Sequence, residues 1–189
     1  MIYLVCLLEE PSAQEMLKGV LPRILPEDVY VQYVVFEGKQ DLEKQIEHRL
    51  RGWQKPESVF LIMRDQDSGD CMAVKQNLLN KVMASGRQDA TIIRIACHEL
   101  ESFYLGDLEA VETGLAISGL GKRQKKKKYK FPDSLSNAAE ELFKITGKRY
   151  QKVAGSRAIG PHLKTNGSNQ SNSFNVLLDG IKKLAGGNP

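Results

Sequence analysis

The sequence contains four apolar segments, and acidic side chains stand at the ends of the first, the third and the fourth. They are Glu9 after the first segment, Asp65, Asp67 and, slightly further on, Asp70 after the third, and Glu99 and Glu101 after the fourth. Carboxylates crowded at one place repel one another, and a divalent cation removes that cost. Carboxylate oxygens are ligands that suit Mg²⁺ and Mn²⁺, so the pattern is consistent with a metal site. It is also typical of ordinary polar loops, because Asp favours turns.

The elements that would position these side chains follow from the hydropathy pattern. Runs of apolar, β-branched and aromatic residues predict strands at 1–8, 29–36, 58–63 and 91–96. Helix-start signals and apolar residues at helical spacing predict helices at 11–21, 39–51, 72–85 and 99–111. This alternation predicts an α/β fold with a mostly parallel four-stranded sheet flanked by helices. Because the carboxyl ends of parallel strands share one edge, we expect the acids to converge there.

Charge is distributed unevenly along the 189 residues. The net charge is +4, yet residues 1–110 carry −6 and residues 111–189 carry +10. Together with the change of pattern after Gly114, this predicts a core at 1–113 and a basic helical and loop extension at 114–189 packed on it. Residues 119–130 and most of 155–173 are expected to be loop, because they are rich in Gly, Lys, Ser and Asn.

Seven cations fall within nine residues of the extension. They are Lys122, Arg123, Lys125, Lys126, Lys127, Lys128 and Lys130. A segregated basic segment indicates a polyanion partner, most commonly nucleic acid, bound through its backbone without reading its sequence. A solvated loop and a protein-docking loop are the alternatives. Tyr129 and Phe131 beside this segment could stack on bases, but we expect them to anchor the end of the loop to the core.

The chain resembles Toprim-type proteins, the fold shared by topoisomerases, DnaG-type primases and OLD-family nucleases. Their signature is a Glu after the first strand and an Asp-x-Asp after the third, here Glu9 and Asp65-Gln66-Asp67. More closely, it resembles a bacterial family of unknown function that is often found with AAA-type ATPases in anti-phage defence. The matching stretches are 9–12, 64–71 with Lys75, 98–107 and 171–174. Toprim proteins usually have Gly where Glu10 stands, so either Glu9 or Glu10 could be the first-strand acid; we expect Glu10 to face solvent.

The resemblance implies a Toprim-like (Rossmann-like) fold and a function. The protein would be a Mg²⁺- or Mn²⁺-dependent nuclease or nickase, acting in phage defence with an ATPase partner, on DNA rather than RNA. Metal ligands would come from Glu9, Asp65, Asp67, Glu101 and Asp70, and Glu9, Asp65, Asp67 and Lys75 would be catalytic. In this hypothesis Lys75 steadies the charge that develops on the phosphate. The alternative is a catalytically silent, Toprim-shaped adaptor that binds an ATPase or nucleic acid.

Cysteine content and the apolar segments indicate the compartment. Three cysteines without framework spacing argue against a disulfide scaffold and for a reducing environment. The adjacent Cys97 and His98 have poor spacing for zinc. The apolar segment 2–8 is too short to span a membrane and lacks the basic start of a signal peptide. We therefore expect a cytoplasmic protein without a membrane partner, and the oligomeric state is left open.

Overall fold

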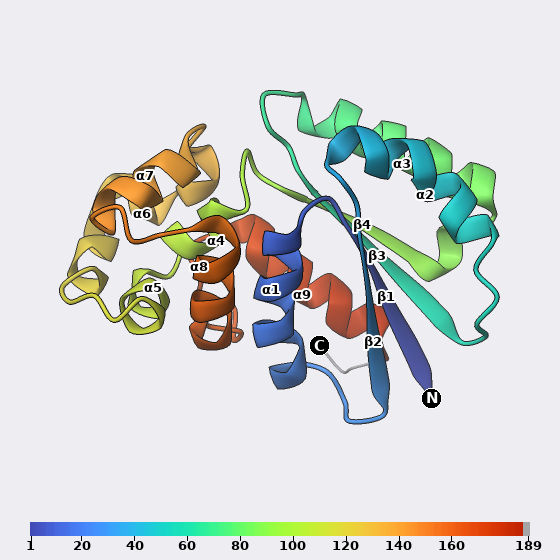
Figure 1. Cartoon of the computed structure of the whole chain (residues 1–189), viewed down its shortest axis with the longest axis horizontal. Coiled ribbons are helices and arrows are strands. Elements are labelled where there is room, and N and C mark those ends of the chain that lie inside the picture. Colours follow the sequence, from blue (N-terminus) through green and yellow to red (C-terminus); the bar gives the residue numbers. More distant parts are fainter. Residues whose placement is uncertain (187–189) are drawn as a thin grey trace.

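The computed structural model describes residues 1–186 and contains one parallel sheet (Figure 1). Its strands are β1 (Ile2–Leu8), β2 (Val29–Val35), β3 (Ser58–Asp65) and β4 (Thr91–Ala96), in the order β2-β1-β3-β4. All three pairings are parallel. The predicted α/β class is confirmed, because helices flank this sheet. Residues 187–189 of the predicted extension lie outside the described residues.

Helices cover both faces of the sheet, which explains why β1 and β3 are apolar along most of their length. The flanking helices are α1 (Pro11–Val20), α2 (Lys39–Arg51), α3 (Cys71–Ser85) and α9 (Asn172–Leu184). α2 and α3 lie on one face, and α1 and α9 on the other (Figure 1). Each face of the sheet has its own hydrophobic core, and successive β1 side chains point alternately into one core and the other. Val5 and Leu7 pack toward α2 and α3, while Leu4 and Cys6 belong to the larger cluster on the opposite face.

A second group of helices lies beside α1, on the left of Figure 1. It contains α4 (Glu101–Leu105), α5 (Leu108–Gly114), α6 (Lys127–Lys130), α7 (Ala138–Ile145) and α8 (Lys152–Ile159). Short 3₁₀ turns occupy Leu21–Arg23, Gln88–Ala90, Gly121–Lys125, Pro132–Ser134 and Gly160–His162. This group and α9 share the hydrophobic cluster of α1, with Tyr104, Tyr129 and Phe174 among its buried rings. Residues beyond 113 therefore share the hydrophobic cluster of α1, and α9 among them covers one face of the sheet.

Two segments differ from the sequence expectation. The predicted helix 99–111 is divided into α4 and α5, because the Gly106 carbonyl accepts a hydrogen bond from Gln170 N at 2.9 Å and Asp107 caps a new helix start. The predicted loop at 155–173 begins inside α8, whose Gly155 lies against the Tyr150 ring. Residues 119–130 also form short helical turns rather than loop alone. No helix among the described residues is long and apolar enough to cross a membrane.

Candidate active site at the carboxyl edge of the sheet

Glu9 joins the ends of the two central strands. Its backbone N–H donates to the Met63 carbonyl at 3.2 Å, which continues the β1–β3 pairing past the end of β1. Its side-chain Oε2 accepts a hydrogen bond from Asp65 N at 3.0 Å. Burial raises the pKa of Glu9, although the Asp65 N–H and the Arg64 guanidinium partly oppose this rise. The predicted convergence of Glu9 with the end of β3 is therefore present in the structure.

A buried arginine organises the outer part of this edge. The Arg64 side chain is only 4% exposed, and its guanidinium lies 3.8 Å from Glu9 Oε2 and 3.6 Å from Asp67 Oδ2. It also forms a close ion pair with Glu43 of α2. Asp67 receives a second cation, since Lys39 Nζ lies 2.8 Å from its Oδ2. Both Glu9 and Asp67 are thus held by positive side chains of the protein itself.

Asp65 also lies near two carboxylates other than Glu9, namely Glu10 and Glu101. Burial raises the pKa of Asp65 well above its ordinary range, and the neighbouring Glu10, Glu101 and Glu9 carboxylates raise it further. The Leu100 N–H opposes this rise only in part. We call Asp65, Glu10 and Glu101 the inner acids. Three carboxylates in one partly desolvated place favour either protonation or a cation.

Glu101 is the most deeply placed inner acid. It is fully buried, and its Oε1 accepts a hydrogen bond from the Tyr150 hydroxyl at 2.8 Å. Its Oε2 is buried without a hydrogen-bond partner among the described residues. Burial raises the pKa of Glu101. A buried carboxylate oxygen without a partner is costly, so this atom needs a proton or a cation to satisfy it.

One lysine from the C-terminal part reaches the inner acids. Lys152 Nζ, at the first residue of α8, lies 3.5 Å from Glu10 Oε2. Partial burial opposes the charge on this lysine, yet the Glu101, Glu10 and Asp65 carboxylates raise its pKa overall. Glu10 is half-buried and accepts a short hydrogen bond from the Ser12 hydroxyl. The expectation that Glu10 faces solvent is wrong, because it turns inward to these partners.

The remaining predicted residues lie elsewhere. Asp70 caps α3, where its Oδ1 accepts from Ala73 N at 2.8 Å. Lys75 is exposed on α3 and lines a groove with Arg94 and Val176, without a contact to the inner acids among the described residues. Within the described chain, no group of three Asp, Glu, His or Cys side chains is arranged to hold a metal ion as it stands.

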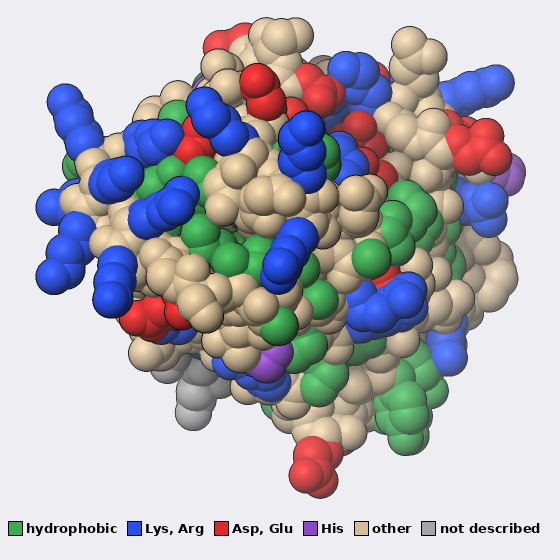
Figure 2. Space-filling view, turned by 60° about the vertical axis from the view of Figure 1, so that its left-hand side comes forward, with side chains coloured by type: hydrophobic (Ala, Val, Ile, Leu, Met, Phe, Trp, Pro, Cys, Tyr) green, Lys and Arg blue, Asp and Glu red, His purple; other side chains and the backbone are tan. Residues whose placement is uncertain are grey.

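The basic segment lies on the surface of the second helix group. All seven of its cations are exposed, and Figure 2, turned toward this group, shows Lys and Arg side chains concentrated there. Lys128 pairs with Glu141 at 2.6 Å. Tyr129 is buried and donates to the same carboxylate at 2.6 Å, so it anchors the segment as expected. Phe131 is 63% exposed, so the expectation that it also packs on the core is wrong.

A sequence model for one protein family, described as Domain of unknown function (DUF4276), matches residues 8–182. The chain belongs to the DUF4276 family. No curated protein and no solved structure matches the chain. The matched range of this DUF4276 protein includes every residue of the carboxyl edge described above.

Several residues of the DUF4276 site have no clear signal in the sequence. Lys152 and Tyr150 lie about fifty residues beyond the last strand-end acid, in a stretch with no recognisable spacing. Arg64 stands next to Asp65 at the end of a buried strand. Because a buried charge requires a partner, this position indicates an ion pair at the strand end. In the sequence, Glu10 is distinguished only because it stands where Toprim proteins usually have Gly.

Proposed function

We propose that this protein is a Mg²⁺- or Mn²⁺-dependent phosphodiesterase that cleaves nucleic acid. The proposal is carried by the coupled inner acids, one of which, Glu101, has a buried Oε2 without a hydrogen-bond partner among the described residues. Desolvated carboxylates destabilise a fold, and perturbed acids of this kind concentrate at functional sites. Their place at the carboxyl edge of a parallel sheet is where α/β proteins bind ligands.

The side chains at this edge fit a hard divalent cation in their chemistry. All the candidate donors are carboxylates, the ligands that Mg²⁺ and Mn²⁺ prefer. Asp65, Glu10 and Glu101 would hold the ion, with Glu9 and Asp67 as the donors nearest to them in the sheet. A bound ion of this type polarises a phosphodiester and lowers the pKa of a coordinated water.

The cations of the site suggest what the chain itself contributes. Arg64 and Lys39 fix the orientation of Glu9 and Asp67 through the contacts described above. Lys152 balances the inner acids and stands where it could donate to a phosphate oxygen, the role that the sequence assigned to Lys75. The exposed cations between 122 and 130 would hold the nucleic-acid backbone, with DNA favoured over RNA.

The test is a cleavage assay on plasmid, single-stranded DNA and RNA with Mn²⁺ or Mg²⁺. The proposal expects metal-dependent cleavage that Asp65→Asn abolishes and Asp89→Asn retains; Asp89 is an exposed aspartate outside the site. Cleavage that persists in Asp65→Asn would exclude the assignment. The same assay repeated with an AAA-type ATPase tests whether such a partner changes the cleavage; the partner and the phage-defence role come from the resemblance.

A catalytically silent adaptor is the second candidate. It is favoured by the ion pairs of Glu9 with Arg64 and of Asp67 with Lys39, because these acids are already neutralised by the protein. The two functions differ in metal binding. A cation that binds only the folded protein raises the melting temperature as its concentration rises. The phosphodiesterase requires this rise with Mn²⁺, and the adaptor predicts an unchanged melting temperature.

A further inference from the structure

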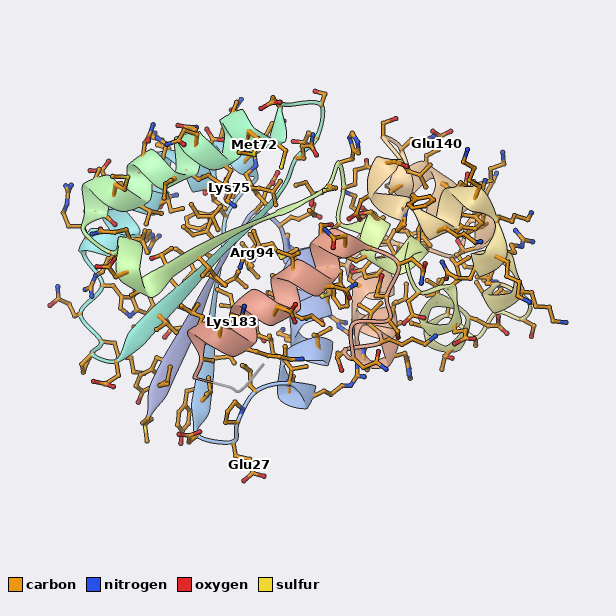
Figure 3. The ribbon with its side chains drawn as sticks, turned by 180° about the vertical axis from the view of Figure 1, so that it is seen from behind. Glu27, Met72, Lys75, Arg94, Glu140 and Lys183 are labelled. Carbon is orange, nitrogen blue, oxygen red and sulfur yellow. The ribbon has the colours of Figure 1, made fainter. Side chains whose placement is uncertain are left out.

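A groove runs along the free side of the edge strand β4, between α3 and α9 (Figure 3). Its volume is about 180 Å³. Its lining combines apolar, polar and cationic side chains, namely Cys71, Lys75, Ile93, Arg94, Ile95, Asn172, Ser173 and Val176. Of these described residues none is acidic. The groove is separate from the inner acids and has no part in the proposed function.

Arg94 is the unusual member of this lining. Its guanidinium is partly buried, donates to the Val176 carbonyl at 3.2 Å and the Ile93 carbonyl at 2.9 Å, and lies against Gly180. Burial lowers the pKa of Arg94, and the hydrogen-bond partners of its guanidinium in residues 1–186 are backbone carbonyls rather than carboxylates. Backbone carbonyls accept hydrogen bonds from Arg94 but do not neutralise its charge, so this partly buried cation is available to an anionic group.

The second cation stands on the opposite wall. Lys75 projects from α3 on the same side of the molecule as Arg94, and it forms no ion pair within the described part of the chain (Figure 3). Within residues 1–186 the groove thus presents two cations that form no ion pair. A ligand that fits it carries negative charge.

Exposed apolar side chains on α3 beside Lys75, together with Val176 of the groove wall, narrow the class of ligand; we call them the apolar rim. Met72, Leu79 and Met83 of α3 are 73%, 36% and 58% exposed, and Val176 of α9 is 44% exposed. The three α3 residues recur at helical spacing and form one stripe beside Lys75. This stripe extends for about 16 Å along the helix, at 1.5 Å per residue. Exposed methionines and aliphatic side chains at this spacing are typical of surfaces that receive amphipathic helices.

We propose that the α3–α9 groove binds an acidic amphipathic helix of a partner protein. Its aliphatic face would cover the Met72 stripe and Val176, and its carboxylates would pair with Lys75 and Arg94. A second copy of this chain is disfavoured, because two such surfaces would bring like charges together. Nucleic acid would leave the apolar rim without a partner. Addition of a β-strand is disfavoured, because the Arg94 side chain already takes the Ile93 carbonyl of the edge strand.

The experiment uses the full-length protein and a fluorescein-labelled synthetic 18-residue helix with leucines at i, i+3, i+4 and i+7 spacing and glutamates elsewhere. Fluorescence anisotropy is expected to give saturable binding to the wild type. Met72→Glu with Val176→Glu places negative charge on α3 beside the groove and on its α9 wall, and it should weaken binding at least about tenfold. The matched control Lys44→Glu lowers the net charge by the same two units at an exposed side chain away from the groove, and it should bind like the wild type.

Two further measurements make the result specific. A peptide with lysines in place of the glutamates is expected to bind at least about tenfold more weakly than the acidic peptide. Hydrogen exchange should show protection of α3, β4 and α9 when the acidic peptide is bound. Equal binding of both peptides, equal binding by the rim variant with a native circular dichroism spectrum, or absence of saturable binding would overturn the proposal. None of these results depends on metal or on cleavage, so failure here leaves the proposed function untouched.

Discussion

At the scale of single residues, the site is dominated by the balance of charge around Asp65. Three carboxylates and one lysine share a partly desolvated volume, and burial disfavours the ionised acids. The protein therefore keeps, at its sheet edge, groups that weaken its fold at neutral pH. Such an arrangement is explained by binding, because a cationic ligand converts the repulsion into attraction.

Asp65→Asn should raise the stability of the metal-free protein. The pKa of Asp65 is raised in the folded state, so between its ordinary pKa near 4 and the raised value the folded protein holds a proton that the unfolded chain releases. Stability from this group is present at low pH and is lost as pH rises through that window. The melting temperature of the variant in EDTA should exceed that of the wild type by a margin that grows as the pH rises above the ordinary pKa of an aspartate.

Subtracting the wild-type curve isolates this effect. Glu15 has a pKa lowered by Lys18 and Arg157, and its contribution has the opposite sign, but it is common to both proteins. A constant margin between the two curves would contradict the burial argument.

Lys152→Met should act in the opposite direction. Removing the only cation in contact with Glu10 among the described side chains leaves the inner acids without compensation. We expect a lower melting temperature at pH 7 and a smaller loss at lower pH, because the raised pKa values of Asp65 and Glu101 favour their neutral forms there. Lys148→Met, an exposed lysine in the preceding turn, is the control. Equal losses for the two variants would show that Lys152 has no special role.

At the scale of elements, close backbone contacts decide how the second helix group meets α1. A Cβ built on Gly19 would lie 2.5 Å from the Pro161 nitrogen and 2.6 Å from the Gly160 carbonyl carbon. Glycine is therefore required in α1 by the approach of the turn after α8. The same helix pairs Glu15 with Arg157 of α8. These contacts bring α8, and with it Lys152, to the carboxyl edge of the sheet.

Gly19→Ala tests this contact. By helix propensity alone the change would stabilise α1 by about 1 kcal/mol. Overpacking against the Gly160–Pro161 backbone should instead destabilise the protein by about 1–3 kcal/mol, measured by urea unfolding. Gln14→Ala in the same helix is expected to stay within about 0.5 kcal/mol of the wild type. A stabilised Gly19→Ala protein would mean that α1 and the turn are not packed as described.

At the scale of the whole molecule, the C-terminal part completes the fold and also carries the basic surface. α9 covers the face of the sheet that β1 presents through Leu4 and Cys6, and its Phe174 and Leu177 are fully buried. The boundary at residue 113 therefore separates two charge patterns, but it does not separate two hydrophobic cores.

A chain of residues 1–113 is expected not to fold cooperatively. It lacks α9 and the Tyr129 and Phe174 rings, so one face of the sheet would be exposed to water. Circular dichroism should show a broad or absent thermal transition, and a dye for apolar surface should bind strongly. A sharp transition in this fragment would show that the first part is an independent domain.

The basic segment should bind nucleic acid mainly through charge. Changing Lys125, Lys126 and Lys127 to Gln should reduce the slope of log affinity against log salt by about 2 to 3 for DNA. The matched control changes Lys44, Lys81 and Lys148, which lie outside this segment, to Gln and has the same net charge. Equal slopes for the two triple variants would exclude a specific nucleic-acid surface at the segment.

The sequence by itself determined the parallel sheet. Apolar strands that alternate with amphipathic helices can bury both faces of a sheet in few arrangements other than a parallel sheet covered by helices. It also placed Glu9 next to the end of β3, since parallel strands end at one edge. The tertiary structure decided the rest: Lys152, Tyr150 and Arg94 acquire their roles from contacts between distant segments, which no local spacing encodes. The tertiary structure also places Lys75 in a separate groove and not at the predicted site. The position of a residue along a helix does not reveal which residues of other elements its side chain contacts.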